Sequence, residues 1–227
     1  CGDVRRASLI FSKCYKKNEA LFGPNAAETL FCMNYVAMCY QVIGDFNSAL
    51  PPFHDCLVKR KTVLGDEDPD TLNSLNNLAV CYQSLGNFTK ALLLFTEYLE
   101  KNEANLGYED PQTLLSLNNL ASCYELMGNF NLALPLYKKC LAKRRTVLGY
   151  EEPDTLLSLN SLASCYQSMG DVNAALPIFI ECLEKQSSVL GDNNPQTIAG
   201  LNSLANCYKL MGDTSLALPL YLECLEK

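Results

Sequence analysis

Apolar residues along this chain recur every three or four positions in paired stretches, and each stretch is closed by a glycine. Between residues 69 and 110, the first stretch ends at Gly86 and the second runs from Phe88 to Gly107. This spacing places the apolar side chains on one face of a helix, and glycine readily adopts the left-handed conformation that ends a helix. We therefore expect two antiparallel helices of about 17 and 19 residues, joined by short connections. No stretch of the sequence alternates apolar and polar residues in the manner of a strand.

The same pattern repeats every 42 residues along the whole sequence. The matching glycines are Gly44, Gly86, Gly128, Gly170 and Gly212, and the matching prolines are Pro69, Pro111, Pro153 and Pro195. A period of this size is typical of a solenoid, in which stacked repeats bury one continuous core. The repeats span 27–68, 69–110, 111–152 and 153–194, with partial repeats at 1–26 and 195–227, and we expect one array over residues 1–227. The prediction is an all-α fold of eleven helices: a lone second-type helix at 3–22, four helix pairs and a truncated fifth pair.

The prolines mark where the first helix of each pair begins. Pro69 fits the first helical position, where its missing N–H would have no partner in any case. Asp68 before it is a suitable cap, and Asp70 after it favours the positive end of the helix dipole. We therefore expect a capped helix start at Pro69.

Several of these residues carry a family resemblance. The pattern of apolar and small residues from Leu75 to Phe95 resembles the tetratricopeptide repeat. The 42-residue period resembles more specifically the kinesin light chain subtype, as do L-N-N-L-A at 75–79, A-L-P-L-Y at 133–137 and V-L-G-Y-E-E-P-D-T at 147–155. The resemblance implies a right-handed superhelix of helix pairs, with the first helix of each pair lining a concave groove. It also extends to bacterial regulators and signalling receptors, so it implies a binding protein without naming the ligand.

If the first helices line a groove, the positions that the core does not use form a polar stripe along it. An asparagine recurs in this stripe in all five repeats, although asparagine is a poor helix former. An amide side chain offers both donors and an acceptor, which match the backbone of an extended peptide. In related arrays, asparagines at matching places contact the backbone of bound peptides. The candidate peptide-binding residues are Asn34, Asn76, Asn118, Asn160, Asn202, Asn77, Asn119, Gln83, Ser122, Ser164, Gln167 and Asn206.

Two other interpretations of the stripe stay open. The amides could bond to the neighbouring helix and so fix the spacing of the repeats, or they could form a merely solvated face. The charges of the groove narrow the class of ligand. Lys209 is the only basic residue on the first helices, against Glu28, Asp70, Glu125 and Asp154. We therefore do not expect a clamp for a terminal carboxylate, nor recognition of acidic cargo segments.

Composition excludes several other partners. The 227 residues are 48% hydrophobic, which is ample for a core, and they carry a formal charge of -7. A negative chain is poorly suited to nucleic acid, and no apolar run approaches the roughly 18 residues that span a bilayer. The sequence begins within a repeat, ends within a helix and shows no signal peptide, so we expect a piece of a longer array. The clusters Lys13-Lys16-Lys17, Lys59-Arg60-Lys61 and Lys143-Arg144-Arg145 are expected to be solvated outer faces near helix C-termini.

The twelve cysteines indicate a reducing compartment rather than a disulfide framework. Ten of them occupy two repeat positions, and Tyr98 stands at one of these positions in the remaining repeat, which a disulfide or metal ligand would not tolerate. No C-x-x-C pair exists, and His54 is the single histidine. We expect small buried thiols, a cytoplasmic location, and neither a metal nor a cofactor.

The sequence contains no constellation typical of an enzyme. Nucleophilic catalysis needs a base beside serine or cysteine, and His54 occurs in one repeat only. Phosphate loops, dinucleotide fingerprints and metalloprotease motifs are absent from the sequence. We expect a non-enzymatic scaffold that binds a protein or an extended peptide in an asparagine-lined groove. The alternative is a self-associating module, or a spacer or sensor module of a larger multidomain protein.

Overall fold

The computed structural model describes residues 2–227, with side chains from Val4 onward, and these residues form helices and no strand. The eleven helices of the described chain are α1 (Gly2–Phe22), α2 (Ala27–Val42), α3 (Phe46–Leu64), α4 (Pro69–Ser84), α5 (Phe88–Leu106), α6 (Pro111–Leu126), α7 (Phe130–Val147), α8 (Pro153–Ser168), α9 (Val172–Leu190), α10 (Pro195–Leu210) and α11 (Thr214–Glu226). The predicted all-α fold of paired helices is confirmed. Cys1 lies outside the described residues.

The helix ends follow the signals in the sequence. At the start of α4, the Asp68 carboxylate accepts a hydrogen bond from the backbone N–H of Asp70 at 2.9 Å, so this side chain caps the helix as predicted. At its end, Gly86 has a φ of 74°, in the left-handed region that glycine enters without steric cost. The start of α5 is likewise capped, because Asn87 accepts from the N–H of Lys90 at 3.3 Å.

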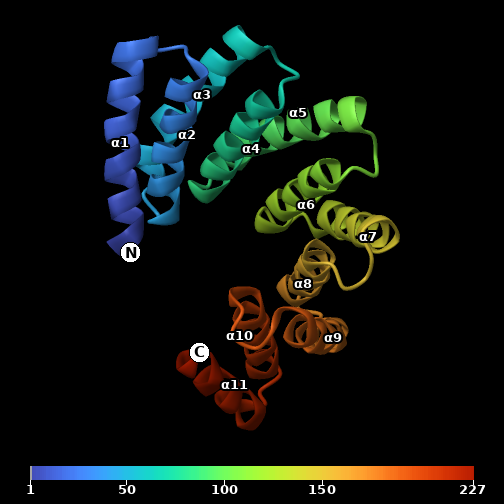
Figure 1. The fold of residues 1–227 in the computed structure, drawn as a ribbon. Coiled ribbons are helices and arrows are strands. Elements are labelled where there is room, and N and C mark those ends of the chain that lie inside the picture. The colour runs from blue at the N-terminus through green and yellow to red at the C-terminus, as the bar shows by residue number, and fades with distance from the viewer. Residues whose placement is uncertain (1) are drawn as a thin grey trace. The chain divides into compact units, whose positions relative to one another are not determined.

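The chain divides into two compact units, here called the N-terminal unit, which ends at Gly107, and the C-terminal unit, Tyr108–Lys227. In the N-terminal unit, α1 to α5 pack in sequence, and the first-type helices α2 and α4 also touch each other (Figure 1). In the C-terminal unit, α6 to α11 pack in the same way, and α6 touches α8 as α8 touches α10. Within each unit, neighbouring first helices therefore lie against each other.

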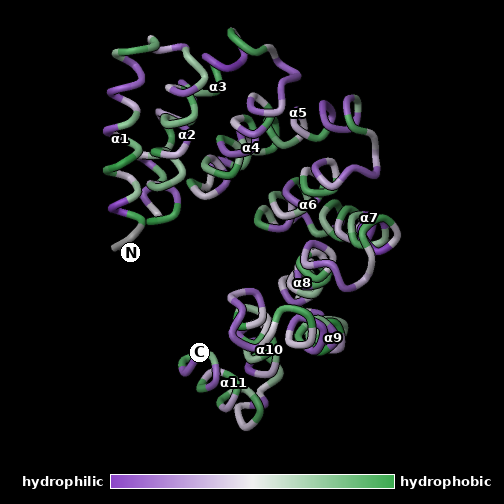
Figure 2. The backbone as a smooth tube through the Cα atoms, in the orientation of Figure 1, coloured by the Kyte–Doolittle hydropathy of each residue, from purple (hydrophilic) through white to green (hydrophobic). Residues whose placement is uncertain are grey.

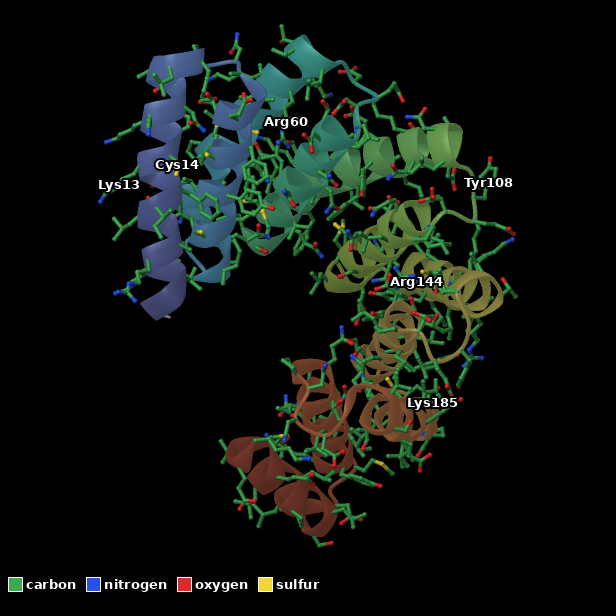
Figure 3. All side chains as sticks on the ribbon, in the orientation of Figure 1. Lys13, Cys14, Arg60, Tyr108, Arg144 and Lys185 are labelled. Carbon is green, nitrogen blue, oxygen red and sulfur yellow. The ribbon has the colours of Figure 1, made fainter. Side chains whose placement is uncertain are left out.

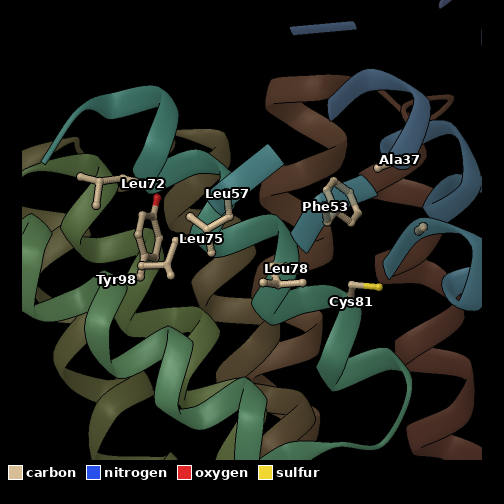
Figure 4. Close-up of a cluster of buried hydrophobic side chains, with 9 residues drawn as sticks. Ala37, Phe53, Leu57, Leu72, Leu75, Leu78, Cys81 and Tyr98 are labelled. Atoms are coloured by element: carbon tan, nitrogen blue, oxygen red, sulfur yellow. The ribbon is translucent and has the colours of Figure 1, made fainter. Parts of the chain in front are cut away.

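Each core is built from large side chains seated against small ones. Hydrophobic and polar residues are interspersed along the helices (Figure 2), and buried hydrophobic residues of neighbouring helices form shared clusters. In the cluster drawn in Figure 4, Phe53 and Tyr98 pack with leucines such as Leu75, beside the fully buried Ala37. Alanines on facing helices leave room for the rings. Replacing one such ring by alanine would leave a cavity, so we expect it to lower the free energy of unfolding by about 3–5 kcal/mol.

Two arginines that the sequence assigned to solvated faces are buried instead (Figure 3). Arg60 is 3% exposed and Arg144 is 1% exposed. Arg60 Nη1 donates to the backbone oxygen of Asp70 at 2.8 Å and to Ser74 Oγ at 2.9 Å. A buried guanidinium is tolerable only when such acceptors replace water. The expectation of solvent exposure is therefore wrong for these two residues, which join a second helix to the next first helix.

The corresponding position in a later repeat uses a smaller polar side chain against a glycine. Gln186 is 3% exposed, and a Cβ added at Gly200 would clash with Gln186 Oε1. Gly200 stands where other repeats have a serine such as Ser74. This glycine therefore makes room for the glutamine.

The eleven described cysteines are free thiols, and nine of them are buried, as expected from the repeat. The thiols of Cys56, Cys140 and Cys182 lie 3.4, 3.2 and 3.3 Å from the backbone oxygens of Leu30, Leu114 and Leu156, to which they donate. Burial raises the pKa of Cys182 to about 12 and that of Cys165 to about 11. A raised pKa keeps these thiols protonated and unreactive.

Among the described helices, none has the length and apolar character to cross a membrane. Within the same residues, no three side chains of the His, Cys, Asp or Glu type gather as a metal site would require.

Candidate functional site

All twelve candidate residues lie on first-type helices, and most are half-buried. In the N-terminal unit they are Asn34 on α2 and Asn76, Asn77 and Gln83 on α4; in the C-terminal unit they are Asn118, Asn119 and Ser122 on α6, Asn160, Ser164 and Gln167 on α8, and Asn202 and Asn206 on α10. Asn34 and Asn118 are buried, and Asn202 is exposed. Within each unit, the candidate residues therefore lie on first-type helices that touch one another.

In the N-terminal unit, one pair of these amides bonds across the helices. The amide nitrogen Nδ2 of Asn77 on α4 donates to Oδ1 of Asn34 on α2 at 3.3 Å. The Nδ2 group of Asn34 has a methionine sulfur as its acceptor, Met38 Sδ at 3.5 Å, and a thioether is a weak acceptor. At this position, the amides bond between neighbouring helices, as expected if they fix the spacing of the repeats.

In the C-terminal unit, the corresponding bond is missing. The residues that match Asn77 on α8 and α10 are Ser161 and Ser203, and their hydroxyls donate to carbonyl oxygens of their own helices at 3.0 Å. The buried oxygens Oδ1 of Asn118 and Asn160 consequently have no hydrogen-bond partner in the protein. An unsatisfied buried acceptor costs about 1–3 kcal/mol. These two amides are held on touching helices without a structural bond to that oxygen.

Two tyrosines occupy other polar groups of the same face. Tyr137 Oη donates to Glu125 Oε2 at 2.8 Å, and Ser168 Oγ donates to Glu125 Oε1 at 2.8 Å. Burial, with Glu125 adding to it, raises the pKa of Tyr137 far above its ordinary value. Tyr221 Oη donates to Asn206 Oδ1 at 2.6 Å. Asn206 is therefore engaged within its own helix pair, and Glu125 has both oxygens occupied.

The N-terminal unit also holds two adjoining cavities on its first helices. One has a volume of about 260 Å³ and is lined by Phe31, Asn34, Tyr35 and Met38 of α2, with Arg60, Asp70, Asn73 and Asn77 on its other side. The other has a volume of about 410 Å³ and includes Asn18, Glu28, Phe31 and Asp70. Phe31 and Asp70 line both cavities, so the cavities adjoin, and together they are here called the α2–α4 groove.

The aromatic residues of this groove were not among the sequence candidates. Phe31 stands where later repeats have Asn73, Leu115, Leu157 and Ala199, and Tyr35 stands where they have Asn77, Asn119, Ser161 and Ser203. The signal that could have found them is a departure from the repeat. A pattern of recurring residues does not reveal Phe31 and Tyr35, because it contains only what the repeats share.

Comparison with known families places most of the chain in repeats. A family model described as "Tetratricopeptide repeat" matches residues 29–104 and 154–227, and a second model with the same description matches residues 113–154. A search of curated protein sequences gives no match.

Solved structures with a similar fold fall into two groups. The first contains a kinesin light chain-like protein of Podospora anserina with nearly identical repeats, at 26% identity and a TM-score of 0.68, over 87% of this chain and 93% of that one. It also contains BtubC (BKLC) from P. vanneervenii, at 21% identity and a TM-score of 0.75, over 98% of this chain and 90% of that one. The likeness to kinesin light chain-like repeat proteins, predicted from the sequence, is confirmed.

The second group was solved with a bound signalling factor or peptide. NprR in complex with its cognate peptide NprX shares 16% identity and a TM-score of 0.77, over 99% of this chain and 62% of that one. A Rap protein complexed with competence and sporulation factor shares 14% identity and a TM-score of 0.76, over 88% of this chain and 54% of that one. This chain therefore spans little more than half the length of either protein. At such low identity, the likeness concerns the fold alone.

Proposed function

This chain belongs to the tetratricopeptide repeat family, and we propose that it is an interaction scaffold whose first helices hold an extended peptide or protein segment by its backbone. The observation that carries the proposal is the pair of asparagines on α6 and α8. The Oδ1 atoms of Asn118 and Asn160 are buried without a partner, on helices that touch. A natural protein satisfies nearly all such groups, so two unsatisfied amides at matching positions call for an explanation.

The chemistry of an amide suits this role. The side chain of Asn118 is 8% exposed while its Oδ1 is covered, so its remaining exposed surface lies on other atoms. Because the covered oxygen has no partner, turning the amide about its last torsion breaks no bond to that oxygen, and the group can present either its donors or its acceptor. An extended peptide offers N–H and C=O groups in alternation, and either can be matched without regard to sequence.

The fold relatives support the proposal at a coarser level. Two structures of similar fold contain a bound peptide or factor by their own descriptions. The net charge of the chain favours a protein ligand over nucleic acid, since this formal charge is -7. Free and largely buried thiols are suited to a reducing compartment, and we propose a cytoplasmic location on that ground.

Paired substitutions test the role of the two amides. A displayed library of random ten-residue peptides is selected against the wild-type chain, and the affinities of enriched peptides are measured for Asn118→Ala with Asn160→Ala. The expected loss is about tenfold, because two hydrogen bonds of about 0.5–1.5 kcal/mol each are removed. The matched control is Asn131→Ala with Asn173→Ala, which removes two exposed asparagines, again 42 residues apart, from the second helices.

The same variants separate the binding role from the structural one. Removing an unpartnered amide costs no hydrogen bond to its oxygen, so we expect the melting temperature to stay the same or to rise. Unchanged affinity in Asn118→Ala with Asn160→Ala, or an equal loss in Asn131→Ala with Asn173→Ala, would contradict the proposal.

A second candidate function, self-association, is favoured by one surface. Leu225 on α11 is 83% exposed, although at the same position of the earlier repeats Leu57 and Leu141 are 6% exposed each and Leu99 and Leu183 are half-buried. In the interior repeats, the next first helix covers this position. Leu218 on the same helix is 56% exposed. Another helix can therefore bury this apolar face of α11, whether it comes from another copy or from another protein.

A further inference from the structure

We infer that the α2–α4 groove accepts a basic side chain of the bound segment, and an arginine in preference to a lysine. The inference rests on the proposed function, since it assigns a side chain to a segment that the first helices of the N-terminal unit bind. It follows from the rings, carboxylates and amide of one groove.

The groove has one aromatic wall that is already in place. The ring of Tyr35 stacks on that of Phe11 from α1, with centroids 4.9 Å apart and planes inclined by 23°. The ring of Phe31 lies 4.4 Å from that of Tyr35, measured between centroids, and Phe31 is 48% exposed. Because α1 supports Tyr35 from behind, the rings need little rearrangement before a ligand arrives. An exposed aromatic face of this kind attracts a planar cation.

The carboxylates of the groove are incompletely paired within the protein, although the buried Arg60 also lines the groove. Neither α2 nor α4 contains a lysine or arginine, and within the described residues no basic group lies within 4.0 Å of Glu28. Asp70 has one such neighbour, Arg60, whose Nη2 is 3.7 Å from Asp70 Oδ2.

That neighbour does not satisfy Asp70. Nη1 of Arg60 is committed to the backbone oxygen of Asp70 and to Ser74 Oγ, and the 3.7 Å separation exceeds that of a charge-assisted hydrogen bond. The side chain of Asp70 remains 59% exposed. Its carboxylate therefore keeps acceptor positions that face the groove.

The chemistry of the groove discriminates among side chains. An acidic side chain would meet Glu28 and Asp70 with like charge, and an apolar one would cover these carboxylates without pairing them. A lysine would satisfy the charge, but its compact ammonium has no planar face. A guanidinium can stack on the exposed ring of Phe31 while its edge donates two hydrogen bonds to one carboxylate.

The backbone beside that arginine also finds a donor. Asn34 is 7% exposed and lines the same cavity, and the acceptor of its Nδ2 group is the Met38 sulfur at 3.5 Å. A peptide carbonyl is a far better acceptor than a thioether. Because Phe31 and Tyr35 have no aromatic counterpart in the later repeats, the preference for a basic side chain belongs to this one groove.

The test uses the full chain and the same random ten-residue library. We expect arginine to be enriched at one position of the peptides selected by the wild type. An enriched peptide is then compared with its Arg→Gln and Arg→Lys forms, on the wild-type chain and on Glu28→Gln with Asp70→Asn. The expected loss for the arginine peptide on this variant is about tenfold, whereas the Arg→Gln peptide binds both chains equally. On the wild type, the Arg→Lys form falls between the two.

The controls separate this inference from the proposed function. Glu100→Gln with Glu184→Gln removes the same charge from exposed positions on second helices and should leave the arginine preference intact. If peptides are enriched without arginine, or if the groove variant keeps the preference, the inference fails while the scaffold function stands. If no peptide is enriched by the wild type, both fail. A melting curve confirms that each variant is folded.

Discussion

At the scale of single residues, Arg60 and Arg144 are buried, although the runs of basic residues that contain them suggest an exposed surface. In each of the runs 59–61 and 143–145, three consecutive basic residues point about 100° apart around the helix, so one of them faces the neighbouring helix. The inward one is Arg60 or Arg144, and its guanidinium bonds to the next first helix. The sequence showed the charge, but only the packing shows which of the three charges is buried.

Arg144 is expected to be a large contributor to the stability of the C-terminal unit. Its Nη1 donates to the backbone oxygen of Asp154 at 2.6 Å and to Ser158 Oγ at 2.9 Å. Arg144→Ala leaves both acceptors buried and opens a cavity, so we expect a loss of about 3–5 kcal/mol in the free energy of unfolding. Urea unfolding measures this loss. The exposed neighbour Arg145→Ala should change stability by no more than about 0.5 kcal/mol, and equal effects of the two would contradict the buried role of Arg144.

The buried thiols make stability depend on alkaline pH. Burial raises the pKa of Cys123 and Cys165 to about 11 and that of Cys182 to about 12, from an ordinary value of 9.0. The folded state therefore keeps protons that the unfolded chain releases, so this contribution is full below pH 9.0 and is lost as the pH rises through the folded values. We expect the melting temperature to fall between pH 9 and 11, and less steeply in Cys123→Ala with Cys165→Ala. The same slope in both proteins would exclude the thiols as its cause.

At the scale of helices, the ends were predictable and the polar bonds between helices were not. Pro69 and Gly86 act through their own backbone preferences, so the sequence alone predicted both ends of α4. The bond between Asn34 and Asn77 joins positions 43 residues apart, one more than the period, and comparison of equivalent positions does not reveal it. Whether an asparagine on one first helix has a partner thus depends on the residue at the position of Asn77 on the next first helix, which is serine on α8 and α10.

Placing an asparagine at this position of α8 tests directly whether it can bond to the neighbouring first helix. Ser161→Asn places an amide on α8 in the register that Asn77 has on α4, so its Nδ2 should donate to the unpartnered Oδ1 of Asn118. We expect stability to rise by about 0.5–1.5 kcal/mol, with little change in helix propensity between serine and asparagine. Peptide affinity should fall, because the amide of Asn118 is then occupied. Urea unfolding and peptide titration measure the two effects, and a loss of stability would show that the register differs.

At the scale of the molecule, the repeat predicts both the polar stripe on the first helices and an apolar surface on α11. Leu225→Glu is expected to abolish concentration-dependent association in light scattering, because a charge at this position cannot be buried against a second copy. Leu93→Glu is the control, since Leu93 is 69% exposed on α5. Equal effects of both substitutions, or association that persists in Leu225→Glu, would exclude α11 as the contact.

The central claim is that the amides of the first helices contact a bound segment, and their own resonances report on it most directly. The side-chain NH₂ signals of Asn118 and Asn160 can be followed in a ¹⁵N-labelled chain while an enriched peptide is added, beside those of Asn131 and Asn173 on the second helices. We predict that the first pair shifts with the affinity measured for the peptide and that the second pair does not move. Shifts confined to the second-helix asparagines, or none at Asn118 and Asn160 at saturation, would contradict the account.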